Sequence, residues 1–480
     1  MLFNSIDFAL FLPIVFLLYW FVFNKRINTQ NLFILLVSYF FYSCWDYRFL
    51  LLLIFSTFLD YFSGIKIHES KTNLTKKVWF WVSIGLNIGF LGFFKYYNFF
   101  ADSFAEALQL IGFKADFWTL KVILPVGISF YTFHGLSYII DIYKEKITPE
   151  KKFVNYAAFV CFFPLLVAGP IERASHLLPQ IKSKRIFDNQ KAVDGLRQIL
   201  WGLFKKVVIA DNCSTYVNEI FNNSTTLGGS TLIIGAVLFS IQVYCDFSGY
   251  SDIALGTARC FGFELLKNFN FPFLSKSVTE FWRRWHISLS TWFNDYLFTP
   301  MIIKWRDSGK RGIYLALIIT FLTAGLWHGA GWNFLVYGLL HGIVLVLEMM
   351  TKKTRKKALS NLPSVFSNTL TIFLTFSFIT FAFVFFRSKN LTLALDFCSN
   401  LFSYSIFSVP TISTIFHFMV LLLFILFFLI VEWKQNKYDH GLFFSKDKNS
   451  WFFRWSVYFS LVCAIILFGS RQQEFIYFQF

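Results

Sequence analysis

The residues most able to do chemistry are concentrated in two stretches of an otherwise apolar chain. Residues 242–300 mix Asp, Arg, His, Ser, Asn and Gly with aromatic side chains, and residues 325–333 (GLWHGAGWN) have the same texture. An ionisable group inside bilayer-grade apolar sequence is costly in free energy, so it indicates a functional site by default. We therefore look for the site residues in these two stretches.

His328, in the second stretch, is the strongest candidate for catalysis. Basic clusters at 304–311 and 352–357 are both expected to face the cytoplasm, so the chain between them enters the bilayer and returns. The apolar run 313–327 has 15 residues, or about 22 Å of helix, which is shorter than a hydrocarbon core about 30 Å thick. This places His328 inside the bilayer, at a turn loosened by two glycines. A desolvated imidazole stays neutral and can act as a general base, although a core histidine bonded to a carbonyl group fits the same pattern.

The motif FWRRWH at 281–286 supplies a second set of candidates. Arg283 and Arg284 could hold a phosphate or carboxylate group of a donor, because a guanidinium pairs with either through two parallel hydrogen bonds. Trp285 lies beside them and is included among the candidate donor-binding residues. His286 could be a second catalytic residue or a structural hydrogen-bond donor. The tryptophans here are also typical of a membrane–water interface, so the segment could simply lie on the cytoplasmic surface.

Two carboxylates in the sequence YCDFSGYSD, Asp246 and Asp252, have several candidate partners. They could orient a histidine or bind a cation, or they could pair with Arg259 or with the arginines of the FWRRWH motif. Trp327 and Asn333, like Asp246, are candidates to hold the tautomer of the imidazole in the second stretch.

Other chemistries are disfavoured by the same residues. The sequence around Ser251 lacks the final glycine of a nucleophile elbow and has no strand–helix context, which argues against a serine hydrolase. His286, His328 and His341 lack zinc-site spacing and an accompanying carboxylate motif, so no metal is expected. The seven cysteines form no CxxC pair and are expected to be small core residues. The net charge of +17 comes from short basic clusters between apolar runs, which is typical of membrane topology rather than nucleic-acid binding.

Composition predicts that membrane-spanning helices hold these residues. The chain is 56% hydrophobic and only 15% charged, whereas a soluble domain has about 25% charged residues. We expect an all-α, polytopic integral membrane protein with about eleven spans. They lie at 7–23, twice within 31–64, and at 78–100, 121–143, 230–245, 313–327, 334–350, 368–386, 411–431 and 451–469. Between 153 and 300 the runs are short or interrupted by lysines (Lys205 and Lys206), so re-entrant, tilted or interfacial helices are expected there. The first span has no basic region before it and is expected to be retained.

Three blocks of the chain resemble the signature blocks of the membrane-bound O-acyltransferase (MBOAT) family, and most closely its alginate O-acetylation branch. They read YCDFSGYSDIALG, FGFELLKNFNFPFLSKSVTEFWRRWHISLSTWFNDYL and GLWHGAGWNFLVYGLLHG. The likeness extends upstream to 124–143 and 162–173 and covers the chain to about residue 345. Residues 346–480 match only as a pattern of spans.

This resemblance implies a funnel-shaped helical fold in a single domain, 1–480, with its signature core at about 120–345. It also implies a multi-pass enzyme of the bacterial inner membrane that passes an acyl group to an extracytoplasmic acceptor. The family's near-invariant histidine corresponds to His328, and its second, frequently retained histidine corresponds to His286. No bound cofactor is implied. The donor substrate would be acetyl-CoA or an acyl-carrier thioester, the acceptor an envelope polysaccharide or peptidoglycan, and a separate extracytoplasmic protein would finish delivery.

Two alternatives remain open at this point. The chain could transfer D-alanyl groups from a carrier protein to teichoic acid, as another branch of the family does. It could instead be a transporter or flippase of an envelope precursor that uses its buried Asp and His residues as a proton relay.

Overall fold

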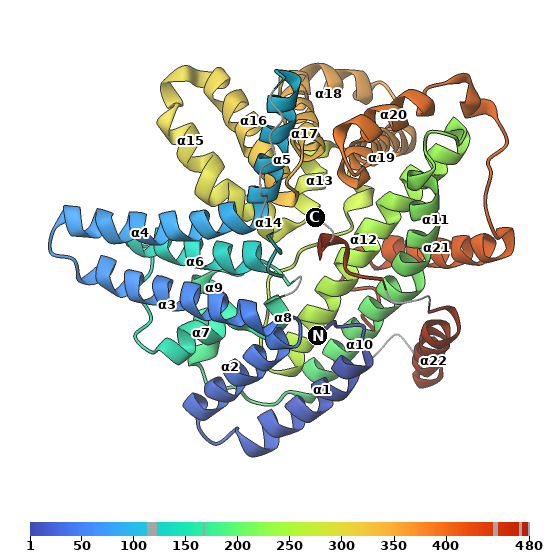
Figure 1. The fold of residues 1–480 in the computed structure, drawn as a ribbon. Coiled ribbons are helices and arrows are strands. Elements are labelled where there is room, and N and C mark those ends of the chain that lie inside the picture. Colours follow the sequence, from blue (N-terminus) through green and yellow to red (C-terminus); the bar gives the residue numbers. More distant parts are fainter. Residues whose placement is uncertain (113–121, 167–168, 445–449, 470–472, 479–480) are drawn as a thin grey trace. The chain divides into compact units, whose positions relative to one another are not determined.

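The structure is a computed structural model that describes residues 1–112, 122–166, 169–444, 450–469 and 473–478. Every regular element in these residues is a helix (Figure 1), so the predicted all-α fold is confirmed. The chain separates into two compact units. Unit 1 comprises Met1–Gly195 and Thr257–Leu266, and unit 2 comprises Leu196–Gly256 and Lys267–Phe480. The expectation of one domain over 1–480 stays a prediction.

Unit 1 is organised around one long helix, α3 (Tyr47–Glu69), which contacts α2 (Ile27–Ser43) and has its most extensive contacts with three others. These are α4 (Asn73–Leu91), α6 (Ile128–Tyr143) and α7 (Phe153–Cys161). The remaining helices are α1 (Ile6–Leu17), α5 (Tyr97–Leu110), α8 (Phe163–Leu166) and α9 (Ala174–Lys182). The short helices α7 to α9 match the irregular elements expected beyond residue 153.

A buried carboxylate, Asp60 of α3, lies at the centre of this packing. It accepts hydrogen bonds from the hydroxyl of Ser83 and the amide of Asn87, each at 2.7 Å. On the facing helix α6, a Cβ atom at Gly135 would come within 1.9 Å of an Asp60 oxygen. Glycine is therefore required there for the close approach, and the carboxylate is satisfied by polar partners as a buried group must be.

Unit 2 contains most of α12 (Gly229–Cys260) and the helices of both chemically distinctive stretches. The short helices α13 (Val278–Arg284) and α14 (Ile287–Phe293) come from the first stretch. The hairpin of α16 (Gly309–His328) and α17 (Trp332–Met350) holds the second. The others are α11 (Asp211–Asn222), α15 (Thr299–Lys304), α18 (Lys352–Ser360), α19 (Ser364–Arg387), α20 (Leu391–Leu401), α21 (Ile415–Gln435) and α22 (Trp451–Phe468). A helix α10 (Asn189–Leu203) leads into this unit through a π-helical segment, Phe204–Ala210.

The α16–α17 hairpin is packed backbone to backbone. A Cβ atom at Gly338 would lie 2.2 Å from the carbonyl oxygen of Phe321, and one at Gly325 would lie 2.3 Å from that of Phe334. Small residues at such crossings let two apolar helices approach closely, which is the usual means of association inside a bilayer. The hairpin is thereby a rigid support for the residue at its tip, His328.

Eight helices of the described residues are long and apolar enough to cross a membrane. They begin at Tyr47, Asn73, Gly229, Arg306, Trp332, Ser364, Ile415 and Trp451. The three other expected spans correspond to shorter helices, Ile6–Val22, α2 and α6. The protein is therefore a multi-pass membrane protein, as predicted, with fewer full-length spans than the sequence indicated.

Two predicted spans have different bounds in the structure. The run expected at 230–245 continues as α12 to Cys260, because its polar residues are covered by protein and do not end the helix. The run expected at 313–327 is the 20-residue helix α16, about 30 Å long at about 1.5 Å per residue. The helix is thus longer than the apolar run, but its first turn carries Lys310 and Arg311, so the depth of His328 in the bilayer stays a prediction. The desolvation of His328 comes from protein packing, since only 2% of the residue is exposed.

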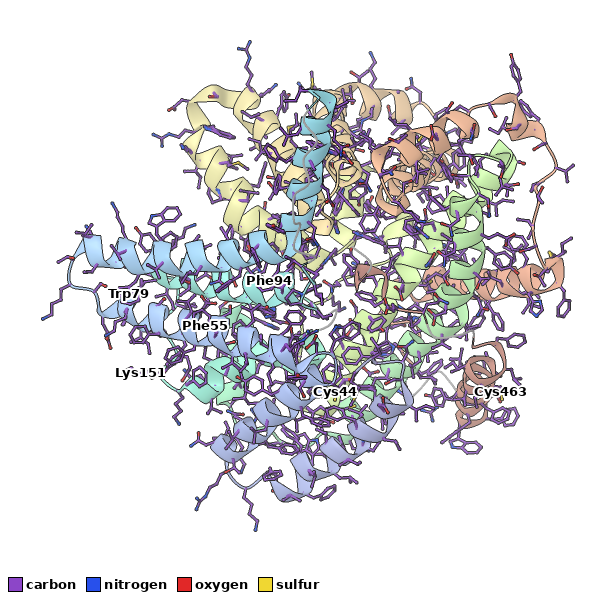
Figure 2. All side chains as sticks on the ribbon, viewed as in Figure 1. Cys44, Phe55, Trp79, Phe94, Lys151 and Cys463 are labelled. Atoms are coloured by element: carbon purple, nitrogen blue, oxygen red, sulfur yellow. The ribbon has the colours of Figure 1, made fainter. Side chains whose placement is uncertain are left out.

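All seven cysteines are free, and four of them are buried, at positions 161, 213, 245 and 260. Cys44 is exposed and Cys463 is half-buried (Figure 2). The expectation of core cysteines holds for the buried four.

Candidate active site

His286 lies at a sharp turn between two short helices. The start of α13 is held by Glu348 of α17, whose carboxylate accepts from the backbone N–H groups of Val278 and Thr279 at 2.9 and 3.0 Å. After α13 the chain turns at His286, which has a left-handed backbone (φ 43°). That conformation is uncommon for a residue with a side chain, although histidine is among the residues that adopt it more readily.

The turn is fixed by a neighbouring segment that contains Asn268. The backbone N–H of Ile287 donates to the Asn268 carbonyl at 2.9 Å, and the Ser288 hydroxyl donates to the Asn268 side chain at 2.6 Å. The imidazole of His286 is consequently held inside the unit, with no exposed surface.

His328 is the last residue of α16 and precedes a tight Gly-Ala-Gly turn. A Cβ atom at Gly329 would lie 2.2 Å from the ring of Phe334. The glycine therefore allows Phe334, in the first turn of α17, to pack against the turn that follows His328. The sequence predicted a glycine-containing turn at this position.

The imidazoles of His286 and His328 both pack against the indole of Trp327. Its ring centroid lies 5.5 Å from that of His286 and 5.0 Å from that of His328. Tyr477 covers the other side, 5.7 Å from His328 and 6.4 Å from His286. Phe247 of α12 packs edge-on against His286 at 4.6 Å. We call these five residues the histidine cluster.

Aromatic rings of the histidine cluster surround the buried His286. Neither ring nitrogen of His286 has a hydrogen-bond partner among the described residues. Burial lowers the pKa of His286, which lies outside the spanning helices, to about 3. A neutral imidazole with uncommitted nitrogens can donate or accept a proton or hydrogen bond from a bound substrate, which a committed core histidine cannot.

A third histidine, His341 of α17, has a structural role. Its Nδ1 accepts from the indole N–H of Trp282 at 3.1 Å, and its ring packs against Tyr337 at 4.7 Å. Tyr337 in turn lies 5.9 Å from His328. His341 thus joins α13 to α17 behind the histidine cluster.

Asp246 does not reach a histidine or an arginine, but pairs with Lys206. The Lys206 ammonium lies 2.7 Å from Asp246 and 2.8 Å from Asp211, and all three residues are buried. The second oxygen of Asp246 accepts from the backbone N–H of Ile476 at 2.8 Å, and Lys206 donates to the Gln473 carbonyl at 3.2 Å. This buried charge therefore holds the segment that carries Tyr477.

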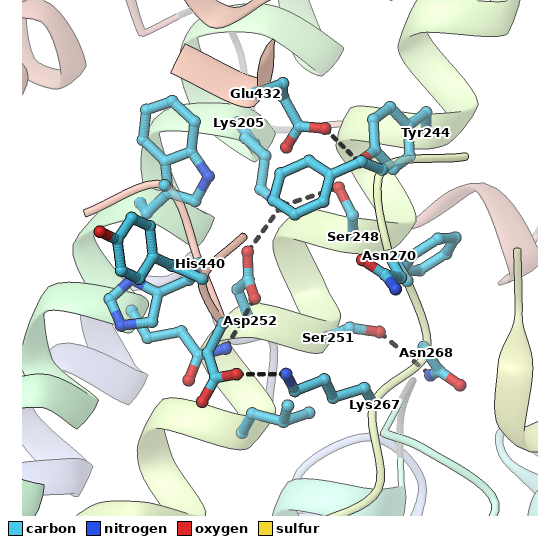
Figure 3. A pocket seen from close by; sticks show the side chains of 18 residues that line it. Lys205, Tyr244, Ser248, Ser251, Asp252, Lys267, Asn268, Asn270, Glu432 and His440 are labelled. Carbon is cyan, nitrogen blue, oxygen red and sulfur yellow. Dashed lines mark hydrogen bonds and ion pairs between the residues drawn. The ribbon is translucent and has the colours of Figure 1, made fainter. Parts of the chain in front are cut away.

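Asp252 pairs with the other lysine, Lys205, at 2.6 Å (Figure 3). Lys205 also donates to Ser248 at 2.8 Å, and Gln198 donates to Asp252 at 2.8 Å. Nearby, the Tyr244 hydroxyl donates to Glu432 at 2.6 Å. The pairings with arginines that the sequence left open are replaced by lysine pairings in unit 2. The lysines that interrupt the 194–210 run point into the protein rather than to a membrane surface.

The remaining predicted residues lie apart from the imidazole nitrogens. Arg283 is exposed, and Arg284 pairs with Glu280 at 2.7 Å. Trp285 is a core residue that stacks on Phe281 at 5.3 Å. Asn333 donates to the carbonyls of Phe385 and Ser388 at 3.1 and 2.8 Å, which caps the end of α19. The tryptophans at 282, 285 and 292 are buried, so they do not form the interfacial belt considered from the sequence.

Two residues of this arrangement were missed by sequence reasoning: Tyr477 and Asp211. For Lys205 and Lys206 the sequence left open an interfacial position or burial against protein, and the structure shows burial. The two lysines in an apolar helical run were a signal of buried pairing, because an unpaired charge there would be costly. Nothing local marks Tyr477. Within the described residues no group of three or more His, Cys, Asp or Glu side chains is placed to hold a metal ion.

Comparison with known proteins decides the class of the enzyme. The family model of the membrane-bound O-acyltransferase family matches residues 148–395. This chain belongs to that family. It is therefore an acyltransferase, and the resemblance seen in the sequence is confirmed.

Individual relatives cover most of the chain. It is 37% identical over 428 residues to the peptidoglycan O-acetyltransferase of Helicobacter pylori. The aligned region covers 82% of this chain and 78% of that relative. This chain is 37% identical over 411 residues to the probable alginate O-acetylase AlgI of Pseudomonas aeruginosa, covering 84% and 75%. The teichoic acid D-alanyltransferase of Bacillus subtilis is more distant, 28% identical over 276 residues, which cover 55% of this chain and 69% of that relative. The relatives support membrane O-acetylation of an envelope polymer.

Proposed function

We propose that this protein moves acetyl groups from cytoplasmic acetyl-CoA to hydroxyl groups of an extracytoplasmic polysaccharide or peptidoglycan. The observation that carries the proposal is the placement of two buried imidazoles, His286 and His328, at 5.5 and 5.0 Å from the ring of Trp327 in a member of this family. The acetyl group is favoured over D-alanyl by the higher identity and coverage of the O-acetylating relatives. The protein would lie in the inner membrane.

In the proposed reaction His328 is the general base. It removes the proton from the acceptor hydroxyl as the oxygen attacks the thioester carbonyl of the donor. The C–O bond forms, the C–S bond breaks, and the imidazolium returns the proton to the leaving thiolate. The surrounding aromatic rings exclude water, which would otherwise compete as the acyl acceptor.

His286 is proposed to donate a hydrogen bond to the oxyanion that develops on the thioester carbonyl. Its low pKa keeps it neutral, and a neutral imidazole has one N–H group to donate. Its left-handed turn, clamped by Asn268, supports a fixed direction for that N–H group.

The other predicted residues are proposed to position this pair or to meet the donor. Asp246 and Asp252 act through their lysines, Asn333 through the end of α19, and Trp285 through core packing, as their contacts indicate. The exposed Arg283 is available to pair with donor phosphates at the cytoplasmic side, and Arg284 would join it by exchanging its pair with Glu280 for the phosphate. We also propose that a separate extracytoplasmic protein completes delivery to the polymer, as the resemblance implied.

The test is base-labile acetate released from envelope glycans of cells that carry a deletion, the wild-type gene or a variant. Acetate is expected to disappear in the deletion, to return with wild type and to remain absent with His328→Ala at equal membrane abundance. The matched control is His417→Ala, which changes an exposed histidine of unit 2. Acetate that does not differ among the strains would overturn the proposal, and ester-linked D-alanine that follows the gene would identify the D-alanyl alternative.

A further inference from the structure

A second pocket in unit 2, away from the histidine cluster, carries positive charge. It has a volume of about 120 Å³ and is lined by residues that include Asn222, Ser224, Thr225, Arg387 and Lys389. Its lining contains two cations and no Asp or Glu. It lies over a small apolar core formed by α11, α12, α19 and α20, which fixes the helix ends that shape it.

Arg387 is held in this pocket without a counter-charge. The guanidinium lies 5.5 Å from the ring centroid of Phe221, and its Nη2 donates to the Asn218 side chain at 2.5 Å. Among the described residues it has no further hydrogen-bond acceptor and no carboxylate partner. A half-buried cation is normally paired, and a guanidinium held flat by an aromatic ring is well prepared to receive a carboxylate through two parallel N–H groups. Lys389 is exposed at the rim and adds a second positive charge.

The pocket and the histidine cluster share the last turn of α19. Phe386, which precedes Arg387, has its ring centroid 5.4 Å from that of His328. Asn333, just after the His328 turn, donates to the carbonyls of Phe385 and Ser388 on the same turn. Arg387 therefore directly follows the residue that packs against the proposed general base, although the pocket lining includes no residue of the histidine cluster.

The side of the membrane follows from the distribution of basic residues. The cluster at 304–311 lies around the start of α16 and the cluster at 352–357 precedes α19, and basic loops face the cytoplasm. Each of these helices then crosses away from the cytoplasm and ends at His328 or Arg387. The pocket is thus on the side from which an extracytoplasmic acceptor would approach.

We propose that this pocket is an acceptor subsite that binds the carboxylate of an acidic sugar residue. The proposal rests on the proposed function and adds a specificity element to it. Arg387 would pair with the carboxylate through its uncommitted N–H groups, Lys389 would add a point charge, and Asn222 and Thr225 would bond sugar hydroxyls. The pocket has room for a carboxylate and adjoining ring atoms, so the rest of the glycan would extend outward.

The test compares an acidic and a neutral trisaccharide of equal length on the purified full-length protein in phosphatidylcholine nanodiscs. The probes are trimannuronate and mannotriose, and the measurement is the equilibrium dissociation constant. Wild type should bind trimannuronate at least about tenfold more tightly than mannotriose, the range of a charge-assisted pair. Arg387→Met and Lys389→Met should remove most of this preference without changing mannotriose binding.

Two further variants keep the test decisive. Arg387→Lys keeps the positive charge but loses the two parallel N–H groups of the guanidinium, so it should retain part of the preference for trimannuronate. It also provides a readout if Arg387→Met fails to fold. Lys434→Met removes an exposed cation of α21 and should leave the preference unchanged.

Equal affinity for the two trisaccharides, or equal loss with Lys434→Met, would overturn the subsite. So would an Arg387 effect seen only in nanodiscs with anionic lipid, because the residue would then be pairing with a lipid headgroup. Measurement of envelope acetate distinguishes a failure of the subsite proposal from a failure of the proposed acetyltransferase function. If acetate still requires the gene and His328 while the trisaccharides bind equally, the acetyltransferase stands and only the subsite falls.

Discussion

Unit 2 buries two sets of ionisable residues almost completely, a pair of lysines and a histidine. They differ in whether their polar atoms have partners. Lys205 and Lys206 are each paired with a carboxylate within 2.8 Å and bonded to a further polar group. His286 is enclosed by rings and has no hydrogen-bond partner among the described residues. Buried groups whose hydrogen-bonding capacity is satisfied hold the fold together, whereas a neutral group with spare capacity is available for chemistry. We call Lys205, Lys206 and their partners Asp211, Asp246 and Asp252 the lysine layer. By this criterion the lysine layer is structural and the histidine cluster is the candidate site.

The largest effect is expected at His328. His328→Ala should lower the turnover of acetyl transfer by about 10²- to 10⁴-fold, the usual contribution of a general base. Initial rates of acetyl transfer with acetyl-CoA and a glycan acceptor measure this. His341→Phe is the control, because it removes a buried histidine that has a packing role. Because His341 is bonded only to Trp282 in the described residues, its variant should lose thermal stability more than turnover. The reverse order of effects would contradict the assignment of the two histidines.

Breaking the lysine layer should cost stability first. Lys206→Met leaves Asp211 and Asp246 buried without their cation, which is expected to destabilise the fold by about 3–5 kcal/mol. The melting temperature in detergent measures this. Lys66→Met is the control, since its pair with Glu69 is exposed at 3.8 Å and such pairs contribute about 0–1 kcal/mol. Equal melting temperatures for the two variants would show that the buried pairs do not stabilise unit 2.

Tyr477 connects the two regions, because the lysine layer holds the segment that places its ring on the histidines. Tyr477→Ala should lower kcat by about tenfold, through looser placement of the imidazoles, whereas Tyr477→Phe should stay within about threefold of wild type. Separate measurement of kcat and KM tests this. If the Phe variant were as impaired as the Ala variant, the hydroxyl would have a direct role that ring packing does not explain.

The smallest effect expected is on the pH dependence of stability. The pKa of His286 is about 3 in the folded protein, whereas an unfolded histidine has a pKa of about 6.5. The unfolded state therefore binds a proton that the folded state does not, and stability contributed by this group falls as pH drops below about 6.5. Wild type should lose more melting temperature than His286→Phe between about pH 7 and 5. A larger loss in the variant would show that His286 gains a charged partner.

Much of the architecture followed from local pattern. Apolar runs with basic clusters between them predicted the membrane class and helices such as α17, α19 and α21 within a few residues of their bounds. The glycines beside His328 marked its turn, because only glycine allows the contact with Phe334. Where polar residues lay inside a helix, as in α12, pattern failed, since a polar residue facing protein looks the same in sequence as one that ends a span.

The sequence by itself determined the family, the multi-pass helical class and the identity of the two histidines as candidates. Those features are encoded in short blocks and in residue spacing, which a chain carries whether or not it is folded. Only the tertiary structure decided which groups meet: both histidines at Trp327, Asp246 with Lys206, and Asp246 with the backbone of Ile476, 230 residues away. Pairing a buried charge requires a partner at a distance of about 3 Å, and that partner is selected by packing rather than by position along the chain.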